Sequence, residues 1–173
     1  MSQQPLDTVT VGDPSLDTLT QELAAIQQTG SRRIALLGSR HVPIMHQQLI
    51  EMMSYALVLG GNRLLTSGAI GTNSAAIKGA MRADANLLTV ILPQSLSRQP
   101  KESRTQLESV IHLIENSKND NLSLGEASAM CNSEIIARCD QLICFAFHDS
   151  DTLLKTCQEA EDLRKIVTLF YFD

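Results

Sequence analysis

Two glycine-containing turns carry the side chains of this chain that are best suited to hold an anion. Ser67-Gly-Ala-Ile-Gly-Thr-Asn73 follows the apolar run 63–66 and precedes a helical pattern rich in small residues, and Gly38-Ser-Arg40 ends the apolar run 33–38. The first N–H groups of a helix have no intrahelical acceptor and attract phosphate, and glycine lets a ligand approach the backbone. The pattern therefore indicates a phosphate site beyond the ends of two strands.

Hydroxyl groups, glycines and one guanidinium are the expected binding groups of this site. Arg40 can clamp a phosphate in a bidentate contact. The expected hydrogen-bond donors are the hydroxyl groups of Ser39, Ser67 and Thr72, and Asn73 is also expected in the site. The glycines expected to permit close approach are Gly38, Gly68 and Gly71. The plainer alternative is that Gly-Ser after a strand is only a turn, and that Ser or Thr before a helix is only a cap.

Several familiar sites are missing from the sequence. No Gly-x-Gly-x-x-Gly follows the first strand, no Gly-Lys-Ser/Thr marks a P-loop, and no Gly-x-Ser-x-Gly marks a nucleophile elbow. We therefore assign no catalytic residue and no cofactor. The four cysteines lack C-x-x-C spacing and do not cluster with histidines, which predicts buried, reduced thiols and no metal site. They are Cys131, Cys139, Cys144 and Cys157.

Composition predicts a globular chain with an aliphatic core. Its 173 residues are 43% hydrophobic but only 3% aromatic, so Leu, Ile, Val, Ala and Met must fill the interior. The formal net charge of −5 provides no overall attraction to nucleic acid. Arg32, Arg33 and Arg40 are the one compact basic group, and they are either a local binding patch or solvated surface charges.

Residues 1–30 read as a polar N-terminal tail that ends in a short amphipathic helix over 17–28, and residues 31–173 read as one domain. The N-terminus has no basic segment followed by an apolar one, as a secretion signal would have. No apolar run is long enough for a membrane span. We therefore expect a cytoplasmic protein.

Strands alternate with helices along the domain, which favours βαβ units with right-handed crossovers. Polar residues 94–104 predict an exposed loop that leads into a helix. Residues 106–114 are either a strand or a helix end, and 116–121 is a loop. The predicted strands are 33–38, 63–66, 87–92, 141–147 and 166–172. The predicted helices are 44–59, 72–83, 124–138 and a last one from Ser150 or Asp151 to 163. The expected fold class is α/β, a Rossmann-like three-layer sandwich with a mostly parallel sheet.

The helix predicted over 44–59 has Pro43 in its first turn and Gly60-Gly61 at its end. Its methionines suit either an adaptable binding surface or core filling, and core filling is the more common use. The apolar set assigned to the core side is Met45, Leu49, Met52, Met53, Ala56 and Leu57.

Three segments resemble the DprA family of DNA-processing, recombination-mediator proteins, a branch of the Rossmann-like SLOG superfamily. Ile34-Ala-Leu-Leu-Gly-Ser-Arg40 resembles its first strand and turn, and Ser67 to Met81 resembles its Ser-Gly turn and the following helix. Asn132-Ser-Glu-Ile-Ile-Ala137 resembles its Arg-Asn-Arg-Ile-Ile-Ala segment and adds Asn132 to the expected site. The resemblance covers about 33–172. It implies single-stranded DNA binding in DNA recombination or uptake, and self-association as a homo-oligomer.

The departures from the family pattern remove charged or titratable groups from the site. The turn is one residue shorter than in the family, and Ile70 precedes Gly71 where the family usually has Arg. Asn73 and Ile77 stand where the family has Asp and His. Cys131 and Ser133 replace the two arginines that flank Asn132. One interpretation is a non-enzymatic DprA-like protein that binds single-stranded DNA or a nucleotide-like phosphate ligand. The alternative is a degenerate member that serves as a protein-interaction or assembly module.

A more distant resemblance connects Ser67 to Ala80 with the LOG-type phosphoribohydrolases. Their glycine-rich catalytic segment and its Glu would fall near 147–155, where the sequence reads Phe-His-Asp-Ser-Asp-Thr-Leu-Leu-Lys. Cleavage of a glycosidic bond needs a carboxylate at that bond. Nucleotide hydrolysis is therefore the least favoured of the three functions.

Overall fold

The computed structural model describes residues 32–147 and 151–172, together with Thr18. Within them, six strands form one parallel sheet in the order β4-β3-β2-β1-β5-β6. The strands are β1 (Arg33–Gly38), β2 (Arg63–Thr66), β3 (Leu88–Ile91), β4 (His112–Ile114), β5 (Gln141–Ala146) and β6 (Ile166–Tyr171). The α-helices are α3 (Ile44–Leu59), α4 (Thr72–Asp84), α5 (Lys101–Glu108), α6 (Leu124–Arg138) and α7 (Asp151–Asp162). The helix expected over 17–28 and a cap at Ser150 lie outside the described residues.

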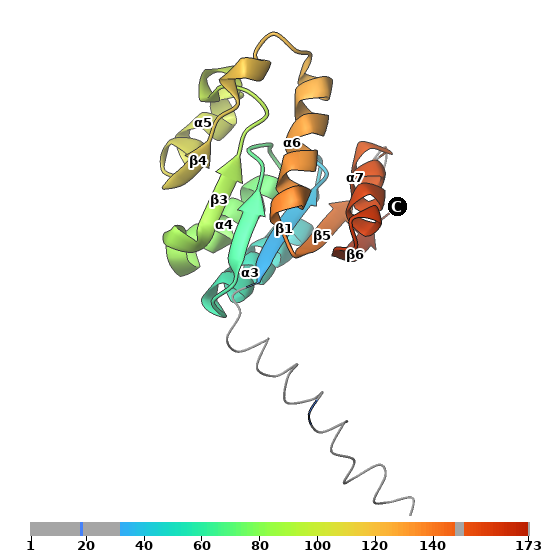
Figure 1. Cartoon of the computed structure of the whole chain (residues 1–173). Coiled ribbons are helices and arrows are strands. Elements are labelled where there is room, and N and C mark those ends of the chain that lie inside the picture. Colours follow the sequence, from blue (N-terminus) through green and yellow to red (C-terminus); the bar gives the residue numbers. More distant parts are fainter. Residues whose placement is uncertain (1–17, 19–31, 148–150, 173) are drawn as a thin grey trace, which may run out of the picture. The chain divides into compact units, whose positions relative to one another are not determined.

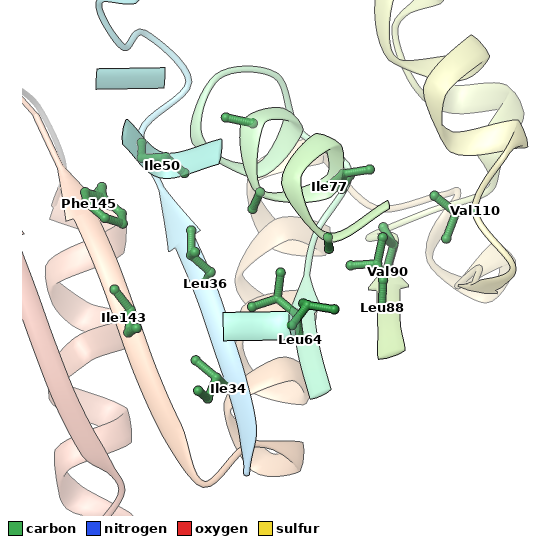
Figure 2. Packing of buried hydrophobic residues seen from close by; sticks show 14 of the residues in the cluster. Ile34, Leu36, Ile50, Leu64, Ile77, Leu88, Val90, Val110, Ile143 and Phe145 are labelled. Atoms are coloured by element: carbon green, nitrogen blue, oxygen red, sulfur yellow. The ribbon is translucent and has the colours of Figure 1, made fainter. Parts of the chain in front are cut away.

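Period-two alternation along the strands builds a core on each face of the sheet. Ile34 and Leu36 of β1 point into one buried cluster, whereas Ala35 and Leu37 point into the other. The first cluster adds residues of α3 and α4, and Figure 2 shows Ile50 and Ile77 packing above the strands. The second adds residues of α6 and α7. Burial on both faces explains why the strands read as continuous apolar runs.

The order of the strands creates a reversal beside β1. From β1 the chain steps outward through β2 and β3 to β4, and it then crosses to the other side of β1 to form β5 and β6. Figure 1 shows α6 on one side of the sheet and α3 and α4 on the other. The three-layer Rossmann-like sandwich expected from the sequence is confirmed, and its switch point lies between β1 and β5.

Small residues let α3 and α4 cross in close contact. Gly79 of α4 lies against the backbone of α3 at Glu51 and Tyr55. The hydroxyl of Ser54, fully buried, donates to the carbonyl of Ala76 at 2.5 Å. Arg82 of α4 pairs with Glu51 at 2.8 Å. This contact fixes which side of α3 faces the protein.

The core side predicted for α3 is wrong for four of its six residues, namely Ala56, which is exposed, and three larger residues. Met45, Leu49 and Met52 are 76%, 60% and 65% exposed. The buried positions are instead Ile50, Ser54 and Val58. The helix has apolar residues around most of its circumference, so their spacing alone did not identify the buried side. Pro43 stands at the N-cap, one residue before the helix.

The segment predicted as an exposed loop over 94–104 is partly buried. Leu96–Arg98 forms a 3-10 turn, and the side chains of Gln94 and Gln99 are buried. The amide of Gln94 donates to the carbonyls of Asn119 and Leu122 at 3.1 and 3.0 Å. Satisfied amides can be buried at little cost, which composition does not reveal.

The ambiguous stretch 106–114 holds both a helix end and a strand, since α5 ends at Glu108 and β4 begins at His112. Two short 3-10 turns, Ala85–Leu87 and Ser117–Asn119, add to the predicted elements. The other strands and helices agree with their predicted ranges to within one residue at each described end.

Substituting Gly79 with Ala should destabilise the protein by about 1–3 kcal/mol, because a Cβ there would overlap the backbone carbonyl of Glu51. Gly125→Ala, in α6, is the matched control. A Cβ at Gly125 meets nothing within 4 Å, so this change should be neutral or stabilising by up to about 1 kcal/mol. Urea unfolding of both variants measures the difference, and equal stabilities would contradict the packing described for α3 and α4.

Candidate functional site

A cavity of about 390 Å³ opens beyond the carboxyl ends of β1 and β2, beside the switch point of the sheet. Six of the nine residues predicted for the site line it, although they come from three separate segments. These six are Gly38, Ser39, Arg40, Ser67, Asn73 and Asn132. The remaining lining residues are Leu37, His41, Ala69, Gly125, Ser128, Thr152 and Leu153.

Ser39 ties the turn after β1 to β5. Its N–H donates to the carbonyl of Phe145 at 2.9 Å, and its hydroxyl oxygen accepts the N–H of Phe147 at 2.9 Å. The side chain of Arg40, the next residue, is exposed at the cavity. The turn thus holds a guanidinium at the cavity on a backbone anchored to the neighbouring strand.

Gly68, Gly71 and Thr72 do not line the cavity, and their predicted contacts with a ligand are replaced by contacts within the protein. The backbone of Gly71 has a φ of +79° and lies against the carbonyl of Arg40. Thr72 is fully buried and donates both its N–H and its hydroxyl to the carbonyl of Ser39, at 3.2 and 2.9 Å. These residues join the two turns to each other. The plainer alternative holds for the turns, but Thr72 is not a cap, because the N-cap of α4 is Gly71 and no side chain caps the helix.

Gly68 permits packing within the protein. A Cβ at this position would overlap the side chain of Leu92 and lie 3.1 Å from that of Leu107. Gly38 is similarly confined, since its Cβ would lie 2.5 Å from the side chain of Thr72. Packing within the protein therefore explains why glycine occupies both positions, independently of any ligand.

Ser67 lines the cavity, but its hydroxyl already has a partner. The oxygen lies 3.7 Å from the sulfur of Cys131, and the thiol of Cys131 donates to the carbonyl of Ile91 at 3.2 Å. Burial raises the pKa of Cys131 to about 11, despite the hydrogen bond from Ser67. A thiol in this environment stays protonated at neutral pH and is a poor nucleophile.

Asn73 is a buried polar residue of the cavity wall, and its side-chain oxygen lacks a hydrogen-bond partner. It stands in the first turn of α4 and is 5% exposed. Among the described residues, no group donates to its Oδ1. A buried acceptor without a partner costs about 1–3 kcal/mol, so a bound donor would be stabilised there. The positive end of the α4 dipole adds an attraction for anions at the same place.

Helices α6 and α7 close the opposite wall. Asn132 donates to the hydroxyl of Thr156 at 3.4 Å. The sequence analysis did not identify Gly125, Ser128 and Thr152 as site residues. The first two lie on one side of α6, about a turn apart, and nothing in their residue types marks them in the sequence.

The three arginines grouped by sequence do not form one patch. Arg32 and Arg33 stand at the start of β1 and Arg40 stands beyond its end, about 20 Å away by strand geometry. Arg33 pairs with Asp140 at 2.9 Å, and this contact holds the pKa of the carboxyl below its usual range. Only Arg40 of the three belongs to the cavity.

The four cysteines are buried and free, as predicted. No group of three or more His, Cys, Asp or Glu side chains in the described part of the chain could hold a metal ion. Helices long and apolar enough to cross a membrane are likewise absent from the described residues.

Fold and site together define a parallel α/β domain of the Rossmann-like class with a cavity at its switch point. Comparison with solved structures makes the class more specific, since the fold is that of DNA processing protein A, DprA. The structure from Helicobacter pylori, described for its single-stranded DNA binding mode, matches with a TM-score of 0.67 at 16% identity. DprA from Streptococcus pneumoniae matches with a TM-score of 0.53 at 14% identity.

These matches cover 83% and 79% of this chain, and they span 66% and 58% of the two DprA chains. No family model matches the sequence. No curated protein matches it either. The DprA-like fold expected from the three sequence segments is therefore confirmed by the shape of the domain.

Raising the pH from 9.0 to about 11 should lower the free energy of unfolding, since the Cys131 thiol stays protonated in the folded protein while it ionises in the unfolded chain. The folded state then binds more protons, and stability falls as pH rises. The contribution of this thiol is about 1–3 kcal/mol. Urea unfolding across that range measures it, with Cys131→Ala as the comparison. An equally steep fall in the variant would contradict the assignment to Cys131.

Proposed function

We propose that this chain binds single-stranded DNA or a nucleotide-like phosphate ligand in the cavity beyond β1 and β2, without covalent chemistry. The observation that carries the proposal is the convergence of six residues, chosen from three sequence segments, on one cavity at the N-terminus of α4. Its volume of about 390 Å³ is in the usual range for small-molecule sites. A nucleoside monophosphate, free or within a strand, is a ligand of suitable size.

The anionic part of the ligand is recognised by Arg40 and by the N-terminus of α4. A guanidinium forms two parallel hydrogen bonds to a phosphate, and the helix dipole acts in the same direction. The chain as a whole is acidic, with a formal net charge of −5, so attraction to phosphate is local to this cavity.

The neutral part of the ligand is recognised by asparagine. The Oδ1 atom of Asn73 is buried and accepts no hydrogen bond from the described residues, so it favours a ligand that carries a donor. A nucleotide offers base N–H groups or a sugar hydroxyl near its phosphate. Inorganic phosphate has no base or sugar to donate to Asn73, so we expect nucleotides and oligonucleotides to bind more tightly than phosphate alone.

Binding without catalysis agrees with the ionisable groups at the cavity. Among the described lining residues, Arg40 and His41 are the two that can carry charge, and a carboxylate for glycosidic cleavage is missing. The likeness to DprA from Helicobacter pylori, whose structure was described for single-stranded DNA binding, supports a DNA strand as the ligand. A cytoplasmic role in DNA recombination or uptake would follow.

A protein-assembly module is the second candidate function. The observation that favours it is the exposed apolar side of α3, where Met45, Leu49 and Met52 face outward. The two functions use different surfaces and can coexist.

Replacing Arg40 with Ala should weaken binding of a fluorescent oligo-dT about tenfold at low salt, because one phosphate loses its bidentate partner. The slope of log affinity against log salt should fall by about 0.7, as expected for one contact to a single strand. Fluorescence anisotropy at several salt concentrations measures both quantities, with a nucleoside monophosphate and inorganic phosphate as competitors.

Arg33→Ala is the matched control, since it removes the same charge at the opposite end of β1. It should leave affinity and slope nearly unchanged. Equal losses in both variants would mean that binding depends on the net charge of the protein and not on Arg40 in particular. Absence of binding to oligo-dT and to nucleotides would overturn the proposal. Turnover of the monophosphate would show that the cavity is catalytic.

Asn73→Ala should reduce affinity for the monophosphate by roughly tenfold, because the ligand's donor would lose the acceptor that Oδ1 provides. Competition titration measures the loss, and circular dichroism verifies the fold. Unchanged affinity would remove Asn73 from the site.

A further inference from the structure

A second cavity, of about 410 Å³, opens where β2, β3 and β4 begin, at the amino ends of these strands. We call it the amino-end cavity. Two of its lining residues, Arg63 and Arg138, are arginines, a third, His112, is histidine, and none is acidic. The chain as a whole has 19 acidic residues against 14 lysines and arginines, so the composition of this cavity is the reverse of the average. Its lining therefore favours an anion.

Strand register places three polar side chains of the amino-end cavity on one face of the sheet. Thr89 of β3 is paired with His112 of β4 on one side and with Leu65 of β2 on the other. Arg63 lies two residues before Leu65 and so shares its face. Strand geometry puts the Cα atoms of Arg63 and Thr89 about 8 Å apart, which a guanidinium side chain can span. The side chains of Arg63 and His112 thus approach Thr89 from the two neighbouring strands.

The charge of Arg63 is not neutralised within the described part of the chain. Its guanidinium makes no hydrogen bond or ion pair with the described residues, although its N–H donates to the carbonyl of Arg32. The residue paired with it in β1, Arg33, is itself held by Asp140 at 2.9 Å. Arg63 is therefore the surplus positive charge at this end of the sheet, and a bound anion would compensate it.

Arg138 reaches the same cavity from the last turn of α6. One nitrogen donates to Glu134 at 2.9 Å, but a guanidinium has five N–H groups and an exposed pair of this kind is weak. The carboxylate of Glu134 also accepts from Asn116 at 3.1 Å, and that of Asp84 accepts the N–H of Asn86 at 2.9 Å. Both acids have partners of their own, and neither lines the cavity.

We propose that the amino-end cavity binds a phosphate group between the guanidinium groups of Arg63 and Arg138, with His112 and the hydroxyl of Thr89 as further donors. Donors from three strands and a helix suit a tetrahedral anion, whereas one guanidinium satisfies a planar carboxylate. The site is separate from the cavity beyond β1 and β2, since Arg63 is paired with Arg33 and so lies about 20 Å from Arg40. The phosphate belongs to a small phosphorylated ligand or to the backbone of a DNA strand.

An NMR titration of the full chain with pyrophosphate tests the proposal at single residues. The backbone amide signals of 87–89 and 111–113 should shift, and Arg63→Ala should weaken this binding about tenfold, because the phosphate loses a bidentate partner. Arg63 is exposed, so the change should leave the fold intact. Lys118→Ala is the matched control, since it removes one exposed charge from the 3-10 turn that follows β4. It should bind pyrophosphate as the wild type does.

Titrations with a dinucleotide and with a long oligo-dT distinguish the two sources of the phosphate. If the site holds DNA backbone, Arg63→Ala should weaken binding of the long oligo-dT several-fold and leave the dinucleotide unaffected. If it holds a small ligand, only pyrophosphate binding should fall.

An absence of shifts at 87–89 and 111–113 with every ligand would overturn the proposal, as would equal affinities of Arg63→Ala and Lys118→Ala for pyrophosphate and for the long oligo-dT. Shifts confined to the cavity beyond β1 and β2 would overturn this inference and leave the proposed function standing. Shifts confined to the amino-end cavity would have the opposite meaning.

Discussion

The backbone and hydroxyl of Ser39 join the three chain segments on which the cavity depends. The carbonyl of Ser39 accepts two hydrogen bonds from Thr72, its N–H donates to Phe145, and its hydroxyl accepts from Phe147. The turn after β1, the start of α4 and the end of β5 are thus held together around one residue. Side chains are excluded at Gly38 and Gly71, since a Cβ at either position would collide with Thr72 or with the carbonyl of Arg40.

These hydrogen bonds give the cavity a defined shape. The cavity itself carries little charge. Arg40 is the one arginine or lysine among the described lining residues, so a ligand would form about one strong ionic contact. A single phosphate contact loses only about threefold in affinity between 50 and 200 mM salt. Selectivity among ligands must then come from hydrogen bonds between uncharged groups. Asn73, whose Oδ1 has no partner among the described residues, is the group best placed to provide one. The site is therefore better suited to recognise one nucleotide unit closely than to hold a long backbone by charge.

The fold could be predicted almost completely, because it depends on local signals. Residues buried on both faces of a parallel sheet form apolar runs, and glycine turns mark the strand ends. The cavity could be predicted in part for the same reason, since parallel strands bring their carboxyl ends to one edge. The roles within it could not, because a hydroxyl such as that of Thr72 binds a ligand or a carbonyl depending on a neighbour 33 residues away. Gln94 was misjudged for a similar reason, as its acceptors, Asn119 and Leu122, lie far along the chain.

The orientation of α3 shows why helical periodicity has a limit. The helix has apolar residues on two sides, and either set could have been chosen as the core. Packing against α4 decides which side of α3 is buried. Gly79 and Ala76 of α4 lie at the crossing, where the small Ser54 of α3 contacts α4 directly. Once that contact forms, Glu51 reaches Arg82, and Leu49 and Met52 are left outside. A stripe of large apolar residues is thus exposed by the tight packing of small ones.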